Sequence, residues 1–176
     1  LSRGLGDVYK RQLIADEPTT ALDTTIAAQI LDLLDELQKQ NGMSILLITH
    51  DLGLVAQRAE DVAVMYASRI VEVANTQRLF QEPLHPYTQG LLKSLPPLLL
   101  SSTRRRGGGR RLQTISGGVP EPLHFPAGCK FHPRCPRGHD DERCQTAEPE
   151  LREVRKGRCV ACWYAKERPH TYVWGI

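Results

Sequence analysis

Two apolar stretches in the first third of the chain predict β-strands that end at polar residues. Residues 13–15 are apolar and run into Asp16 and Glu17, which a proline follows. Residues 44–49 are mostly apolar, without polar alternation, and end at His50. Continuous apolar runs of this kind are typical of strands that are covered on both faces of a sheet. We therefore expect two central strands whose carboxyl ends carry these three polar side chains.

Between the two strands, the spacing of isoleucine and leucine predicts an amphipathic helix over residues 24–40. Asp23 is a natural N-cap for this helix, and Gly42 is suited to its C-terminal end. The order strand, helix, strand predicts an α/β layer with a parallel sheet, because a crossover helix connects parallel strands.

Shorter elements are expected after His50. The apolar pattern and the turn residues predict a hairpin with helices before and after it. The helices cover residues 51–59, 76–81 and 85–95, and the hairpin strands cover 62–66 and 70–73 with a tight turn at 67–68. The α/β part then ends near two prolines at residues 96–97, and serine, arginine and glycine mark a linker over residues 97–115.

The bulk composition is that of an ordinary globular chain. Hydrophobic residues make up 40% of the 176 residues and charged residues 24%, which provides enough apolar material for a core. The net charge of +3 gives no general argument for nucleic-acid or membrane binding. Five arginines at 104–106, 110 and 111 flank three glycines, and we interpret them as a solvated linker in preference to a phosphate-binding patch.

The chain also lacks the sequence signals of a membrane or secreted protein. No apolar stretch approaches the ~20 residues of a membrane-spanning helix. Residues 1–12 have no apolar middle region of the kind that a secretory leader contains. We therefore expect a cytosolic chain with reduced thiols.

Asp16, Glu17 and His50 predict phosphate chemistry at one edge of the sheet. In nucleotide hydrolysis one carboxylate holds Mg²⁺ and a second polarises the attacking water, and adjacent residues at a strand end can do both. Ligands bind at the carboxyl edge of open α/β sheets, where His50 could hydrogen-bond a terminal phosphate. Each residue alone is a weak signal, because Asp-Glu pairs and strand-end histidines are more often structural.

The joint pattern is far more specific. Residues 13–23 read Leu-Ile-Ala-Asp-Glu-Pro-Thr-Thr-Ala-Leu-Asp, and residues 47–51 read Leu-Ile-Thr-His-Asp. Together they resemble the second half of an ABC transporter ATPase domain. The resemblance covers residues 13–96 and implies part of a P-loop NTPase fold with a parallel sheet.

The resemblance also implies a role for each polar residue. Asp16 is then the Walker B carboxylate that binds Mg²⁺, Glu17 the general base and His50 the switch histidine. Residues 21–23 form the D-loop, so that Asp23 contacts a second ATPase subunit and two ATP molecules lie between the subunits.

Further stretches narrow the resemblance and also depart from it. Residues 65–71 and the run Pro-Leu-His-Pro-Tyr at 83–87 resemble the oligopeptide/dipeptide and nickel importer branch. That branch usually has glycine where this chain has Ser68, so we expect a slightly strained turn. The sequence contains no G-x-x-x-x-G-K-[ST] loop, and ATP binding by this chain alone is not expected. Residues 1–12 lack the family's Leu-Ser-Gly-Gly signature. We interpret them as an unmatched leader, an assembly artefact that is joined to a truncated coding sequence.

All five cysteines lie in the last third of the chain, within a Cys-rich extension over residues 116–176. This segment resembles the carboxyl-terminal extension of the same importer ATPases, some of which are thought to carry an iron–sulfur cluster. The ligands at matching positions are Cys129, Cys135, Cys144 and Cys162, and four thiolates suit a [4Fe-4S] cluster.

Cys159 departs from that pattern and leaves an alternative open. It forms a C-x-x-C pair with Cys162, so these two could bind zinc with two of the remaining cysteines, and His132 could contribute. We favour iron–sulfur over zinc, although thiolates suit both metals. Unligated buried thiols come third, and disulfides are least expected in the cytosol.

These patterns lead to one main prediction and two rivals. We expect the ATP-hydrolysing, energy-coupling subunit of an ABC importer for peptides, which uses ATP and Mg²⁺ and lies peripherally at the cytoplasmic face of the plasma membrane. Its implied partners are a second ATPase subunit, membrane permease subunits and an external substrate-binding protein. A non-catalytic metal-binding fragment or regulatory module is the first rival, favoured by the absent phosphate loop. Nucleic-acid binding is the second, and we do not expect it.

Overall fold

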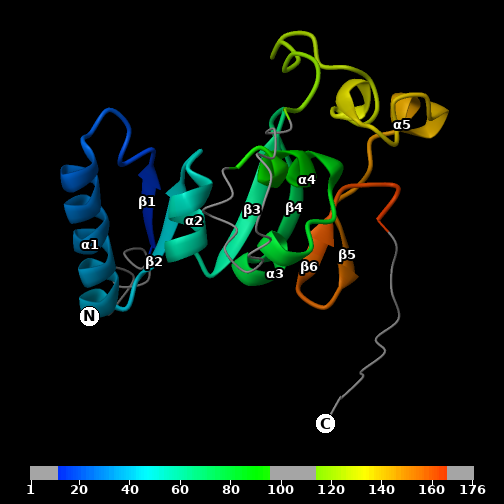
Figure 1. Cartoon of the computed structure of the whole chain (residues 1–176). Helices are drawn as coiled ribbons and strands as arrows, with labels where there is room; N and C mark the ends of the chain where they lie inside the picture. Colours follow the sequence, from blue (N-terminus) through cyan, green and yellow to red (C-terminus); the bar gives the residue numbers. More distant parts are fainter. Residues whose placement is uncertain (1–11, 96–113, 166–176) are drawn as a thin grey trace, which may run out of the picture. The chain divides into compact units, whose positions relative to one another are not determined.

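A computed structural model describes residues 12–95 and 114–165 of the chain (Figure 1). These residues belong to two compact units that divide between Ala59 and Glu60. Nearly all of the expected leader, and most of the expected linker with its arginine cluster, lie outside the described residues. Within the described ranges, no helix combines the length and the apolar character needed to cross a bilayer.

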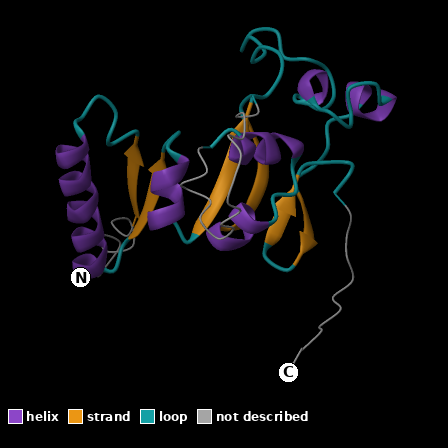
Figure 2. Cartoon of the chain, viewed as in Figure 1, coloured by secondary structure: helices purple, strands orange, loops and turns teal. Residues whose placement is uncertain are grey.

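From residue 12 onward, the first unit contains one pair of parallel strands and two helices (Figure 2). Strand β1 (Gln12–Asp16) pairs in parallel with strand β2 (Ser44–Ile48). Helix α1 (Thr24–Asn41) connects the two strands, and helix α2 (Leu52–Arg58) follows β2. The predicted α/β layer with a parallel sheet is confirmed.

The ends of α1 follow from the residues that flank it. A carboxylate oxygen of Asp23 accepts hydrogen bonds from the backbone N–H groups of Thr25 and Ile26, at 3.0 and 2.9 Å. These bonds satisfy donors that have no partner inside the helix. Gly42 has a φ of 59°, a left-handed conformation that ends helices and that glycine adopts without steric cost. Both residues therefore have the capping roles that the sequence predicts.

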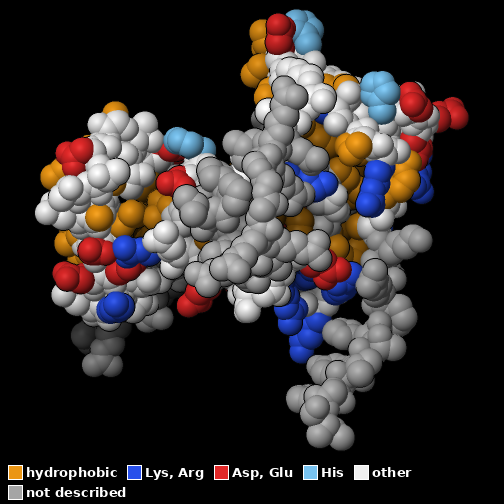
Figure 3. All heavy atoms as spheres, in the orientation of Figure 1, with side chains coloured by type: hydrophobic (Ala, Val, Ile, Leu, Met, Phe, Trp, Pro, Cys, Tyr) orange, Lys and Arg blue, Asp and Glu red, His pale blue; other side chains and the backbone are white. Residues whose placement is uncertain are grey.

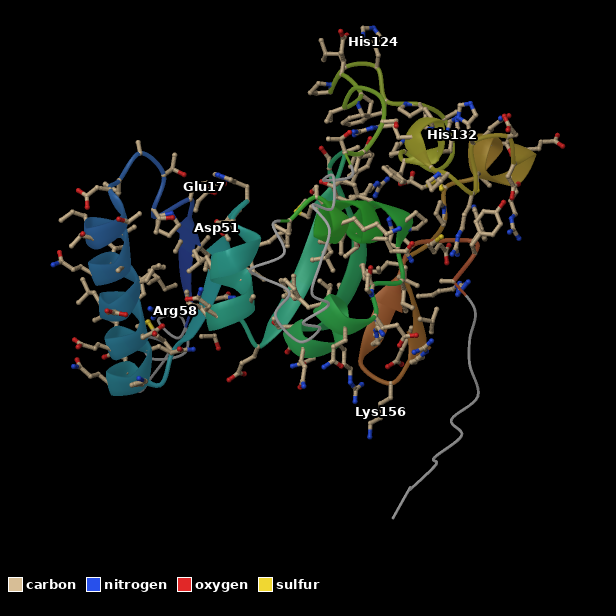
Figure 4. The ribbon with its side chains drawn as sticks, in the orientation of Figure 1. Glu17, Asp51, Arg58, His124, His132 and Lys156 are labelled. Atoms are coloured by element: carbon tan, nitrogen blue, oxygen red, sulfur yellow. The ribbon has the colours of Figure 1, made fainter. Side chains whose placement is uncertain are left out.

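Ion pairs connect the two helices of this unit. Arg58 in α2 donates a hydrogen bond to Asp32 of α1 at 2.8 Å and forms a second ion pair with Asp35. Asp32 and Asp35 are three residues apart and lie on the same face of α1. Figure 4 shows Arg58 in the space between α1 and α2.

The prediction that β1 and β2 are covered on both faces is wrong for the described residues. Side chains alternate between exposed and half-buried along both strands. Ile14 is 63% exposed, and Leu46 and Ile48 are 46% and 44% exposed. Figure 3 shows hydrophobic side chains at the surface of this unit. The physical reason is its size, because two short strands and two helices leave one face of the sheet without a packing layer.

The second unit is built on a four-stranded antiparallel sheet with the order β3-β4-β6-β5. Strands β3 (Asp61–Tyr66) and β4 (Arg69–Asn75) form the predicted hairpin. Strands β5 (Arg152–Arg155) and β6 (Arg158–Val160) come from the Cys-rich extension, and β6 pairs with β4. The extension thus continues the sheet of the hairpin. We did not predict β5 and β6, because they are short and rich in arginine.

The turn between β3 and β4 carries the strain that the sequence predicts. Ala67 and Ser68 have φ values of 48° and 63°, which residues with a side chain adopt at a cost. Two consecutive residues with positive φ match the right-handed twist of the flanking strands, which explains why the hairpin tolerates them. Among its described residues, this unit also contains helices α3 (Thr76–Gln81), α4 (Pro86–Lys93) and α5 (Glu142–Thr146) and the 3₁₀ helix η2 (His132–Arg134).

Four rings join the hairpin, α4 and the cysteine-bearing loop. Phe131, which is 2% exposed, contacts Tyr66 of β3 and Tyr87 of α4 with ring centroids 5.2 and 5.6 Å apart. His85, the N-cap of α4, lies 5.8 Å from the same ring. Burial lowers the pKa of His85 to about 4, so this imidazole is neutral at physiological pH. The cluster therefore fixes the extension against the hairpin by apolar packing.

Candidate functional site

The carboxyl ends of β1 and β2 bring together the residues for which phosphate chemistry is predicted. Asp16 is the last residue of β1 and pairs with Ile48, the last residue of β2. The N–H group of Glu17 donates to the carbonyl of Ile48 at 2.9 Å, so the strand pairing extends one residue further. His50 follows β2 by two residues. Figure 4 shows Glu17 and Asp51 at the same end of this strand pair.

Both carboxylate oxygens of Glu17 are hydrogen bonded. Oε1 lies 2.8 Å from Nδ1 of His50, and Oε2 accepts a hydrogen bond from the hydroxyl of Thr20 at 2.6 Å. The His50 side chain is 80% exposed, whereas that of Glu17 is 36% exposed. The carboxylate is thus held between two side chains while remaining accessible to water.

These contacts shift both pKa values toward the charged forms. The hydrogen bond from Thr20, followed by that from His50, lowers the pKa of Glu17. The hydrogen bond to Glu17 is the main reason why the pKa of His50 is raised. A carboxylate and an imidazolium stabilise each other in this way when they share a hydrogen bond. Glu17 is consequently ionised at neutral pH, as a general base must be.

A tight turn presents Glu17 at the sheet edge. Its φ is 48°, and the N–H group of Thr20 donates to the Glu17 carbonyl at 3.0 Å. Positive φ at a residue with a side chain is uncommon and often marks functional positions. Pro18 follows directly and fixes its own φ, which limits the paths that the turn can take.

The other two predicted residues of this edge lie nearby with different surroundings. Asp16 is exposed at the strand end, beside Glu17 in the chain. Asp23 caps α1, so its carboxylate has a structural role within the chain. Its predicted contact with a second subunit stays a prediction.

Sequence reasoning missed Thr20 and Asp51. The signal for Thr20 was a hydroxyl three residues after Glu17, a spacing at which a turn brings two side chains together. Asp51 accepts N–H bonds from Gly53 and Leu54, at 2.8 and 3.2 Å, and so caps α2 directly after His50. The rigid start of α2 therefore limits where the histidine backbone can move.

Four of the five cysteines in the extension lie in or next to its loops and short helices, outside the strands. Cys144 lies in α5, and its carbonyl accepts a hydrogen bond from the Cys129 N–H at 2.8 Å. Cys135 follows η2, and its sulfur accepts a hydrogen bond from the Gly138 N–H at 3.3 Å. Cys162 follows β6 and belongs to the apolar core of the extension.

Burial is the main cause of raised pKa values at three of these four thiols. Burial raises the pKa of Cys144 to about 11, and the charge of Asp141, followed by those of Cys129, Cys135 and Cys162, adds to this shift. Burial also raises the pKa values of Cys129 and Cys162, each with a smaller contribution from Cys135. Cys159 is not among the thiols that contribute to these shifts, and it lies in β6 opposite Val73.

Two glycines allow the loop to pack closely around the thiols. A Cβ atom at Gly138 would lie 2.8 Å from the sulfur of Cys144, and a Cβ atom at Gly128 would lie 2.5 Å from its carbonyl oxygen. His132 is also committed locally, because its Nδ1 lies 3.0 Å from the Cys129 carbonyl. In the part of the chain that the structure describes, no three His, Cys, Asp or Glu side chains stand in an arrangement that could hold a metal ion.

Comparisons with known proteins test the family resemblance of the chain. Residues 71–144 match the family described as the oligopeptide/dipeptide transporter, C-terminal region. The oligopeptide transport ATP-binding protein AppD of Bacillus subtilis is 49% identical over 155 residues, which cover 88% of this chain and 44% of AppD. The dipeptide transport ATP-binding protein DppD of Haemophilus influenzae is 51% identical over 149 residues, which cover 84% of this chain and 42% of that protein.

The chain is a relative of the oligopeptide/dipeptide transporter ATP-binding proteins. The family resemblance inferred from residues 13–96 and from the Cys-rich extension is therefore confirmed. The chain spans less than half the length of the curated proteins that it matches. Among solved structures, CbiO1 of Clostridium perfringens, described as part of the ABC transporter complex CbiONQ, is 38% identical over 41% of this chain and 29% of that chain. Its TM-score of 0.38 is too low to bear on the fold.

Proposed function

We propose that the chain is the carboxyl-terminal part of an ATP-hydrolysing subunit that drives peptide import through an ABC transporter. The observation that carries this proposal is the contact between Glu17 and His50 at the carboxyl edge of two parallel strands. The same chain is 49% identical to an oligopeptide transport ATP-binding protein, which supports this assignment of the edge.

In the proposed reaction, Glu17 is the general base. Its ionised carboxylate takes a proton from a water molecule, whose oxygen attacks the γ-phosphorus of ATP. The bond from that phosphorus to the bridging oxygen breaks, and ADP leaves with the electron pair. His50 hydrogen-bonds the terminal phosphate and orients it against this water.

Asp16 is the residue proposed to hold Mg²⁺. Its carboxylate is exposed at the strand end, and Mg²⁺ binds proteins through one or two carboxylates with water and substrate phosphates as further ligands. The donor type therefore fits the ion, which would neutralise charge on the phosphates. The phosphate loop itself is proposed to lie in a part of the longer protein outside these 176 residues.

The proposed partners follow from the same assignment. Asp23 would contact a second ATPase subunit, and membrane permease subunits would place the pair at the cytoplasmic face of the plasma membrane. An external binding protein would deliver the cargo. The exposed apolar residues Ile14, Leu46 and Ile48 are consistent with a longer protein that covers this face of the sheet.

Cargo is tested by transport in cells. The full-length protein, expressed from its complete coding sequence together with the proposed permease and binding-protein subunits, is introduced into cells that lack peptide uptake. We expect uptake of a radiolabelled dipeptide or oligopeptide that depends on Glu17. Uptake of radioactive nickel without peptide uptake would contradict the peptide assignment, and a complete coding sequence without a phosphate loop would contradict the ATPase assignment.

We further propose that Cys129, Cys135, Cys144 and Cys162 bind a [4Fe-4S] cluster. Four neighbouring thiols in a loop rich in glycine and proline support this proposal, since thiolates are the ligands of such clusters. The thiols as described do not yet form a metal-binding arrangement, so we expect small movements of the loop on binding. The position of Cys159 in β6 makes the zinc site built on Cys159 and Cys162 the weaker alternative.

The cluster is tested by metal analysis after anaerobic purification. We expect iron and sulfide in equal amounts and visible absorption that dithionite bleaches. Replacement of Cys144 by serine should abolish both, and replacement of Cys159 by serine should leave them unchanged. Stoichiometric zinc without iron would overturn the iron–sulfur assignment. Loss of iron on replacement of Cys159 would overturn the assigned ligand set.

A further inference from the structure

The Glu17 carboxylate has two partners of different kinds. Oε1 lies 2.8 Å from a histidine whose side chain is 80% exposed, and Oε2 accepts from the Thr20 hydroxyl at 2.6 Å. Resting on the proposed function, we propose that Thr20 is a positioning residue that holds the Glu17 carboxylate in the orientation needed for ATP hydrolysis.

The backbone fixes the distance between the two side chains. The Thr20 N–H group donates to the Glu17 carbonyl at 3.0 Å, which closes a turn over the four residues from Glu17 to Thr20. Next along the chain, Leu22 donates to the Thr19 carbonyl at 3.3 Å, so a second turn overlaps the first. The Thr20 side chain is therefore anchored at its base, and no long-range rearrangement is needed to keep its hydroxyl beside Glu17.

The two side chains differ in their own freedom. Threonine is branched at Cβ and has one rotatable bond before its hydroxyl, so its rotamer is restricted. Glutamate has three such bonds, and its carboxylate would sample many orientations at an exposed strand end. A hydrogen bond of a hydroxyl to a charged carboxylate is short and strong, as the 2.6 Å separation indicates. The rigid partner thus orients the flexible one.

Thr20 and His50 therefore have different roles at the Glu17 carboxylate. Each carboxylate oxygen has two lone pairs, so an oxygen that accepts one hydrogen bond can accept another. In the proposed reaction His50 turns to the terminal phosphate and leaves Oε1 of Glu17. Thr20 keeps its bond to Oε2 throughout and retains its proton, so that Oε1 is directed at the water. The proton of the water passes to Oε1, and the hydroxyl of Thr20 takes no part in the transfer.

The test compares threonine variants of the full-length protein in steady-state ATP hydrolysis. Thr20→Val keeps the shape and removes the hydroxyl, Thr20→Ser restores a hydroxyl, and Thr19→Val is the matched control next to it. We expect Thr20→Val to lower kcat about tenfold with the KM for ATP unchanged, because orientation acts on the chemical step. Thr20→Ser should recover kcat to within about twofold of wild type, and Thr19→Val should match wild type within the same range.

Four outcomes would overturn the proposal. They are an unchanged kcat in Thr20→Val, a raised KM with unchanged kcat, a Thr20→Ser variant as slow as Thr20→Val, and a Thr19→Val variant as slow as either. ATP affinity, measured by equilibrium binding, shows that a slow variant is folded. The proposed function is judged separately, because an active wild type and an inactive Glu17→Gln variant keep it standing when Thr20→Val is as fast as wild type. A full-length wild type without ATPase activity would overturn both.

Discussion

Removal of the Glu72 carboxylate is expected to destabilise the second unit strongly. Glu72 lies in β4 and is completely buried. Its two oxygens accept hydrogen bonds from the backbone N–H groups of Leu84 and His85, both at 2.9 Å. Arg158 of β6, which is 3% exposed, donates to the same carboxylate at 3.2 Å and also contacts Glu82. One side chain therefore connects β4, the start of α4 and a strand of the extension.

The size of the effect follows from the groups that lose a partner. Loss of one member of a buried ion pair costs about 3–5 kcal/mol, because the other charge stays buried. Each backbone N–H group left without an acceptor adds about 1 kcal/mol, and the remaining contact of Arg158 with Glu82 offsets part of the total. We expect Glu72→Ala to lower the free energy of unfolding by about 4 kcal/mol. Glu72→Gln keeps the shape and one acceptor and should cost about 2 kcal/mol.

The assay is urea denaturation followed by tryptophan fluorescence. Trp163 reports on the extension, because its indole N–H donates to the Ala147 carbonyl at 3.1 Å. Trp174 is replaced by phenylalanine in every variant so that a single tryptophan remains of the two in the chain. Glu150→Gln, at an exposed glutamate of the same unit, is the matched control and should leave the midpoint unchanged. A Glu72→Ala protein within about 1 kcal/mol of wild type would show that the buried Glu72 carboxylate does not hold these elements together.

Three further measurements address other parts of the account. The pKa of His50 is raised and that of Glu17 is lowered, so the two side chains form an ion pair at pH values between the two pKa values. This ion pair is lost as the pH rises through the pKa of His50 or falls through that of Glu17. An NMR titration of His50 should show its pKa falling toward that of a free histidine in Glu17→Gln, and an unchanged pKa would contradict the contact. Phe131→Ala should lower the free energy of unfolding by about 3–5 kcal/mol in the fluorescence assay, and a loss below about 1 kcal/mol would exclude the aromatic cluster as an anchor. Ser68→Gly should raise the free energy of unfolding by about 0.5 kcal/mol, because the relief of steric strain in the left-handed conformation exceeds the entropy that glycine adds to the unfolded chain. A decrease in the free energy of unfolding would contradict the assigned strain.

The parts of the fold that the sequence predicted are those with local signals. Asp23, the helical spacing after it and Gly42 together define α1, because capping and periodicity act within a few residues. The approach of Glu17 and His50 was also foreseeable, since the carboxyl ends of parallel strands lie at one edge.

The parts that were missed depend on partners far apart in the chain. Glu72 and Arg158 are separated by 86 residues, so no local pattern in the sequence indicates that they pair. Strands β5 and β6 were missed because arginine is usually exposed and both strands are short. The pairing of β6 with β4 and of β5 with β6 overrides that preference. The exposed face of β1 and β2 was missed because both strands are apolar. An apolar strand pattern indicates a sheet that is covered on both faces, but it does not show which segments supply the covering layers.

The proposed function requires that the sheet edge formed by Asp16, Glu17 and His50 hydrolyses ATP. It is tested most directly by the ATPase rate of the full-length protein in wild type, in Glu17→Gln and in Glu36→Gln, an exposed glutamate of α1 that serves as the matched control. We predict that Glu17→Gln lowers kcat at least about a hundredfold while ATP still binds, because the proton of the attacking water loses its acceptor. Glu36→Gln should hydrolyse ATP at the wild-type rate. A Glu17→Gln protein that hydrolyses ATP as fast as wild type would contradict the account.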